Sequence, residues 1–227
     1  MVSAECPGVR LEASLPFVTM FLTGVDWSGD PGADSYGPGN PGYLCFAFAS
    51  IDSDDLPALN KALATVRSRH GLVGTYVFKH SGSSDRIRGD FLEAVEHIEL
   101  QVRVMLVDKS RDWPPEFWRF TGNQRIASCV AEGVGRLPSG LVDGHTLLLD
   151  LNQKKDGRFC TMIIKAAHRS TRTGQRHGFR KVKCCPDTHN THGEIVQVAD
   201  MVAGTVRKAA TIQPHGFPQL QRIVAPW

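Results

Sequence analysis

The sequence predicts a single α/β domain whose mixed central sheet has about five or six strands flanked by helices. Short apolar runs, rich in β-branched and aromatic residues, alternate with segments of helical periodicity along the whole chain. The length of 227 residues fits one large domain, and no internal repeat or low-complexity linker divides it. We therefore expect one domain over residues 17–212, preceded by an N-terminal extension (1–16) and followed by a C-terminal tail (213–227).

The predicted strands are short runs bounded by residues that favour turns. Phe17–Asp26 and Gly42–Ile51 come first and are separated by a loop dense in glycine and proline, so the sheet should open with a hairpin. Further strands are predicted at Val73–Lys79, Val102–Val107, Thr146–Leu151 and Phe179–Cys185.

The helices between these strands are predicted from apolar residues spaced three and four apart. Leu56, Leu59, Leu63 and Val66 show this spacing in a helix that should end before Gly71. Later helices are expected after Ser84 or Asp85, from Pro114 to about Gly135, around the apolar stripe Phe159–Ala167, and over Ile195–Val206. Asp200 falls at the flank of the buried stripe of the last helix.

Three apolar strands are each followed or closed by an aspartate: Asp26, Asp108 and Asp150. In open α/β sheets the carboxyl ends of the strands line the crevice where ligands bind, although an aspartate there is also a common turn and cap residue. Asp200, beside a packed apolar stripe, is a fourth candidate. Carboxylates gathered around one crevice repel each other unless a cation is bound, and such hard oxygen ligands suit Mg²⁺ or Mn²⁺.

The positive charge of the chain is concentrated in one segment. The whole chain carries a formal charge of +3, but residues 154–183 hold ten of the 26 lysines and arginines and a single acid, Asp156. Such a segment can bind phosphates of nucleic acid, or it can be a solvated helix face. The cations we expect to hold a nucleic-acid strand are Lys109, Lys165, Arg169, Arg172, Arg176 and Arg180.

Signals for export or membrane insertion are absent from the sequence itself. The N-terminus has no basic segment followed by an apolar one, and no apolar stretch approaches the roughly 20 residues of a membrane span. We therefore expect a cytoplasmic protein without a membrane partner.

Four segments of the chain carry a resemblance to a known family. They are GVDWSGDPG (24–32), FKHSGSSDRIRGDFLEAV (78–95), VRVMLVDK (102–109) and EIVQVADMVAG (194–204), the last being the most specific. Together they resemble the domain of unknown function 3800 family over roughly Phe17 to Lys208. That family is similar to the ribonuclease H-like fold, in which acidic residues hold divalent metals for phosphodiester cleavage.

The resemblance implies roles for the aspartates. Asp26 would be the first-strand metal ligand and Asp200 the last-helix ligand. Between them, likeness to the family points to Asp150, whereas counting strands against ribonuclease H points to Asp108. The family often has acids where this chain has Trp27 and Val77. Asp30 and Asp187 are candidates to compensate for that loss.

Two hypotheses of function follow. The first is a divalent-metal-dependent nuclease that uses Asp26, Asp150 and Asp200 as metal ligands, with Asp108 as a fourth catalytic group, on DNA or RNA. The second is a catalytically inactive ribonuclease H-like module, which binds nucleic acid or protein partners within a larger nucleoprotein complex. Trp27 and Val77 in place of acids favour the second.

Overall fold

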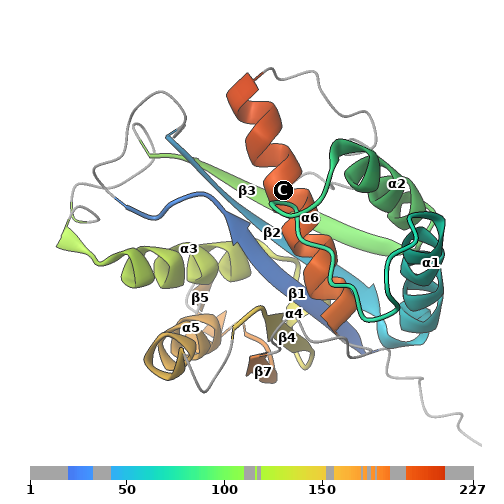
Figure 1. The fold of residues 1–227 in the computed structure, drawn as a ribbon. Helices are drawn as coiled ribbons and strands as arrows, with labels where there is room; N and C mark the ends of the chain where they lie inside the picture. Colours follow the sequence, from blue (N-terminus) through green and yellow to red (C-terminus); the bar gives the residue numbers. More distant parts are fainter. Residues whose placement is uncertain are drawn as a thin grey trace, which may run out of the picture.

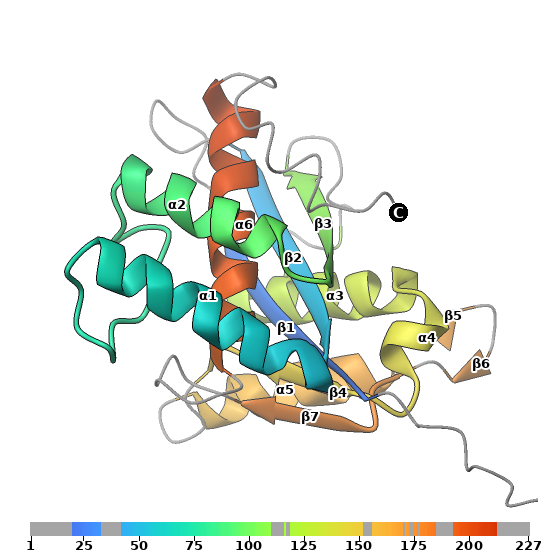
Figure 2. The same cartoon turned by 90° about the vertical axis from the view of Figure 1, so that its right-hand side faces the viewer.

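A computed structural model describes residues 20–32, 42–109, 116, 119–151, 156–169, 171–172, 175–176, 178–184 and 193–212. It shows a five-stranded sheet with helices on both faces (Figures 1 and 2), so the predicted α/β fold class is confirmed. The predicted extension (1–16) and tail (213–227) lie outside the described residues. Within the described part of the chain, no helix combines the length and apolar character needed to cross a membrane.

The central sheet consists of β1 (Phe21–Ser28), β2 (Tyr43–Asp52), β3 (Leu100–Asp108), β4 (Thr146–Leu149) and β7 (Lys181–Cys184). Its spatial order is β3-β2-β1-β4-β7. β2 runs antiparallel to both of its neighbours, whereas β4 is parallel to β1 and to β7. The sheet is therefore mixed, as the sequence predicted. A separate pair, β5 (Thr171–Arg172) and β6 (Gln175–Arg176), forms a small antiparallel ladder.

One face of the sheet is covered by α1 (Leu56–Arg69), α2 (Asp85–Glu96) and α6 (Gly193–Ile212), with the short η1 (Ser53–Asp55) leading into α1. Helix α6 lies across β1 and β2, as Figure 1 shows. Gly24 of β1 permits this close approach, because a Cβ atom there would lie 2.6 Å from the backbone oxygen of Ile195. The sequence thus brings the middle of β1 directly under α6.

The opposite face is covered by α3 (Gly122–Arg136) and α5 (Gly157–Arg169), with the short α4 (Ser139–Val142) between them in sequence. A capping box starts α3: the Thr121 hydroxyl accepts from the Gln124 amide, and the Gln124 side chain accepts from the Thr121 amide. The helix therefore begins at Gly122 rather than at Pro114, which lies outside the described residues.

The strand predicted at Val73–Lys79 is absent, and the sheet has five strands. The backbone of this segment bonds to side chains instead of to a neighbouring strand: the Phe78 amide donates to Gln197 Oε1 at 2.9 Å, and Arg67 Nε donates to the Tyr76 carbonyl at 2.7 Å. Apolar residues that suggested a strand are here used to pack against α6. The segment consequently runs beside that helix and ends near Asp200.

Candidate functional site

Strand register places Asp26 and Asp150 beside each other. Val25 of β1 pairs with Leu149 of β4, and the two aspartates are the next residues along these parallel strands. Leu22 and Leu148 both belong to the core under α6, and side chains alternate along a strand, so Asp26 and Asp150 lie on the α6 face. Asp200 approaches the same place from α6. Three separate elements thus contribute one carboxylate each.

The three carboxylates are close enough for their charges to affect one another. Asp26 is only 8% exposed, and its pKa is raised well above the usual range by burial first and then by the charges of Asp200 and Asp150. The pKa of Asp200 is also raised, mainly by burial, against the opposing effect of the His80 amide, which donates to Asp200 Oδ2 at 2.7 Å. The cluster therefore resists full ionisation in the absence of a cation.

Lys79 supplies a positive charge within this aspartate cluster. Its Nζ donates to Asp150 Oδ2 at 2.5 Å, and its charge also favours ionisation of Asp26 and Asp200. The segment anchored to α6 through Phe78 and His80 brings Lys79 to this position. Sequence reasoning missed Lys79 because the segment was assigned to a strand, although its place at the start of the 78–95 motif was a usable signal.

The donor chemistry of the cluster fits a divalent metal ion. Three carboxylates and one ammonium leave an excess of two negative charges when all are ionised, and Mg²⁺ and Mn²⁺ prefer such oxygen ligands. Across the described residues, however, no group of three or more histidine, cysteine, aspartate or glutamate side chains is arranged as a ready-made metal site. The cation observed at Asp150 is Lys79.

Asp108 lies away from the cluster. It pairs with Tyr43, whereas the partner of Asp26 on β2 is Ala47, which pairs with Val104 on β3. Asp108 is therefore four residues farther along and two strands away, about 16 Å from Asp26 at ordinary sheet spacings. Of the two residues left open by the sequence, the structure brings Asp150 to Asp26 and Asp200.

Lys109 is buried and holds a loop in place. Its side chain is 1% exposed, and Nζ donates to the backbone oxygens of Asp30 at 3.1 Å and Gly32 at 3.3 Å. Burial lowers the pKa of Lys109. We predicted that Lys109 holds a nucleic-acid strand, and its burial does not fit that role. It instead fixes the loop that follows β1.

The other predicted cations are described only in part. Lys165 on α5 and Arg180, just before β7, are exposed. Arg169, Arg172 and Arg176 lie in α5, β5 and β6, and their side chains are outside the described part of the structure. Sequence reasoning did not single out Lys183, which is exposed on β7 and pairs with Leu148, so it shares the sheet face of the aspartates.

The structure also locates Trp27, which stands where the family often has an acid, and Asp30, which could compensate for the lost acids. Trp27 packs on the opposite face, against Phe46 and Phe159, and therefore points away from the aspartates. Asp30 accepts a hydrogen bond from the Gly32 amide at 2.8 Å within the loop after β1. Asp187 lies outside the described residues.

Comparisons with known proteins give similarity to solved structures. No protein-family model matches the chain, and no curated protein matches it. Among solved structures, it is similar to the crystal structure of the ribonuclease H2 from Pyrococcus horikoshii OT3, with a TM-score of 0.48 and 18% sequence identity over 83% of this chain and 72% of that chain. The resemblance to the domain of unknown function 3800 family stays a prediction.

Proposed function

We propose that this protein is a divalent-metal-dependent nuclease that cleaves phosphodiester bonds in DNA or RNA. The observation that carries the proposal is the meeting of Asp26, Asp150 and Asp200, which come from β1, the end of β4 and α6. Burial and the neighbouring carboxylates raise the pKa of Asp26 and Asp200, which is costly to the fold, and such costs are typical of functional sites.

Asp26, Asp150 and Asp200 would hold one or two Mg²⁺ or Mn²⁺ ions. A bound ion of this kind supplies activation of the attacking water and stabilisation of the leaving oxygen. Lys79 would exchange its contact with Asp150 for a contact with a substrate phosphate, because the carboxylate is then used as a ligand. The His80 amide, which donates to Asp200, would keep that carboxylate oriented.

Exposed cations support nucleic acid as the substrate. Lys183 lies on the sheet face of the aspartates, one strand away from Asp150, and Arg180 is exposed just before β7. Cations flanking a metal site can bind the phosphates on either side of the reacting one.

The test is degradation of labelled DNA and RNA at low salt with Mn²⁺ or Mg²⁺. We expect the parent to cleave at least one of them and the double variant Asp26→Asn with Asp200→Asn to cleave neither. Asp108→Asn should keep activity because Asp108 is outside the cluster, and Asp54→Asn, an exposed aspartate, is the neutral control. Cleavage by the double variant at the parental rate would overturn the proposal.

A non-catalytic nucleic-acid-binding module is the second candidate, and the Lys79–Asp150 ion pair favours it. A lysine that already neutralises Asp150 can stabilise the fold without any metal. In that case the protein would act as a subunit of a larger nucleoprotein complex. Calorimetry separates the two: Mn²⁺ uptake that disappears in Asp26→Asn supports the nuclease, and no uptake at millimolar Mn²⁺ supports the binding module.

A further inference from the structure

A cavity of about 340 Å³ opens beside the aspartate cluster, where the C-terminal half of α6 meets the start of α2 and the end of β1. Its lining is polar and basic. The side chains that matter for its chemistry are those of Ser28, His80, Arg88, Arg207, Lys208 and Thr211. We refer to it as the basic pocket.

The basic pocket and the aspartate cluster share one side of α6. Gly204 lies four residues after Asp200, Arg207 and Lys208 lie three and four residues after Gly204, and Thr211 lies four and three residues after them, which aligns the five along the helix. Gly204 leaves room for the His80 ring, because a Cβ atom there would lie 2.1 Å from it. His80 therefore separates the two sites: its amide bonds to Asp200 and its ring lines the pocket.

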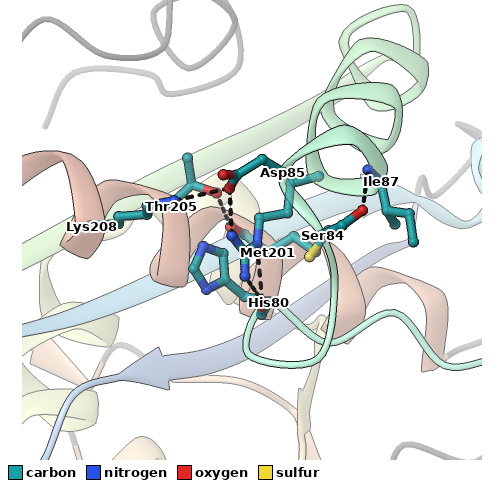
Figure 3. A network of polar contacts seen from close by, with 8 residues as sticks. His80, Ser84, Asp85, Ile87, Met201, Thr205 and Lys208 are labelled. Atoms are coloured by element: carbon teal, nitrogen blue, oxygen red, sulfur yellow. Dashed lines mark hydrogen bonds and ion pairs between the residues drawn. The ribbon is translucent and has the colours of Figure 1, made fainter.

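The pocket has more positive than negative charge. Asp85 Oδ1 accepts from Arg88 Nη1 at 2.6 Å and from Lys208 Nζ at 2.9 Å, and the side chains of this network gather between α2 and α6 in Figure 3. Asp85 thus balances one of the three cations Arg88, Arg207 and Lys208.

Arg207, which lines the basic pocket, has a side-chain nitrogen available to donate a hydrogen bond. Its Nε is buried, and no hydrogen-bond partner for it is found among the residues that the structure describes. The ring Nε2 of His80 is likewise buried, and it too has no partner within the described part of the chain. Buried polar groups of this kind normally find a partner, and the oxygens of an anion in the basic cavity could supply one.

We propose that the basic pocket binds a phosphate group of the nucleic-acid strand, remote from the reacting phosphate; this rests on the proposed function. Arg207 and Lys208 lie seven and eight residues beyond Asp200, about 10–12 Å along the helix axis at 1.5 Å per residue. That distance corresponds to about three base-pair rises of about 3.4 Å each along the axis of a duplex. The pocket would therefore set how much strand must extend beyond the cleaved bond.

The first experiment measures binding without cleavage. A fluorescently labelled single strand of 12 nucleotides is titrated with protein in EDTA at several salt concentrations. Arg207→Gln with Lys208→Gln should weaken binding about tenfold or more and make the log–log salt slope shallower by about 0.7 for each lost phosphate contact. Lys61→Gln with Arg86→Gln, a matched pair of exposed cations outside the pocket, should change neither quantity.

The second experiment separates this proposal from the proposed function. Inorganic phosphate is titrated calorimetrically into the parent and the variants, with Lys208→Gln alone as a milder variant should the double variant not fold. If the parent binds phosphate, the pocket variants do not, and the parent cleaves no nucleic acid, then the proposal of a phosphate-binding pocket stands and the proposal of a nuclease is overturned. If the parent cleaves nucleic acid but its salt slope equals that of the pocket variants, then the proposal of a nuclease stands and the proposal of a phosphate-binding pocket is overturned.

Discussion

The two faces of the central sheet bury different kinds of side chain. Under α3 and α5 the core is built from aliphatic and aromatic groups such as Phe46, Phe48 and Val130. Under α6 a similar apolar core also surrounds charged groups, among them Asp26, Arg67 and Glu194. Among the described residues, the buried carboxylates Asp26 and Glu194 lie on the α6 face, whereas the buried cations Lys109 and Arg125 near α3 donate to backbone oxygens of the loop after β1. Burying charge costs free energy unless it is paired, so the carboxylates give the α6 face an additional cost. We infer that the α3–α5 face provides stability and the α6 face provides function.

The largest effect is expected at the buried ion pair of the α6 face. Arg67 Nη2 contacts Glu194 Oε1 at 2.9 Å, and the side chains are 4% and 3% exposed. Glu194→Gln should lower the free energy of unfolding by about 3–5 kcal/mol, because it leaves the Arg67 charge buried without its partner. Urea denaturation measures this loss.

The control for this prediction is an exposed pair of the same chemistry. Arg136 and Glu132 on α3 interact at 2.7 Å but are 54% and 58% exposed. Glu132→Gln should cost less than about 0.5 kcal/mol. Equal losses in the two variants would contradict the distinction between the buried ion pair of the α6 face and an exposed pair on α3.

A substitution that creates a cavity in the core under α3 and α5 should reduce stability without affecting the aspartate cluster. Ile163 is fully buried in α5, and Ile163→Ala should cost about 2–5 kcal/mol in urea denaturation. Binding of Mn²⁺ and of a labelled strand, measured well below the melting temperature, should equal that of the parent. A loss of either affinity would show that the two faces are not functionally separate.

Neutralising Asp26 of the aspartate cluster should increase stability, in contrast to the substitutions above, which decrease it. The pKa of Asp26 is raised by burial and by Asp200 and Asp150, so its ionised form destabilises the fold near neutral pH. Asp26→Asn in EDTA should therefore raise the melting temperature by about 2–4 °C, which corresponds to about 1 kcal/mol in a domain of this size. The Trp27 amide can still donate to the new amide oxygen.

Asp150→Asn is the matched variant within the same cluster. It also removes a negative charge, but it takes away the carboxylate that Lys79 contacts. We expect no increase in melting temperature, because the lost ion pair offsets the reduced repulsion. If both variants were stabilised equally, Lys79 would have no specific preference for Asp150.

Much of this arrangement could be predicted from sequence, since apolar strands ending in aspartate and a stripe flanked by Asp200 are local patterns. The choice between Asp108 and Asp150 could not be made, because it depends on the pairing of Val25 with Leu149 across 124 residues of chain. Lys79 escaped notice because its apolar neighbours pack against a helix instead of joining the sheet. Lys109 was misplaced because spacing alone does not tell a buried lysine from an exposed one.

The smallest effect is expected for two cysteines that lie on opposite faces of the sheet. Burial raises the pKa of both Cys45, under α6, and Cys129, on α3, to about 12. At pH 8 only about one thiol in ten thousand is then ionised, against about a quarter for a free cysteine, so alkylation should be very slow at both. Native protein treated with iodoacetamide and mapped by mass spectrometry should show neither labelled, whereas urea should expose both. Labelling at Cys45 alone would show that the α6 face opens locally more often than the other, as expected if buried charge weakens it.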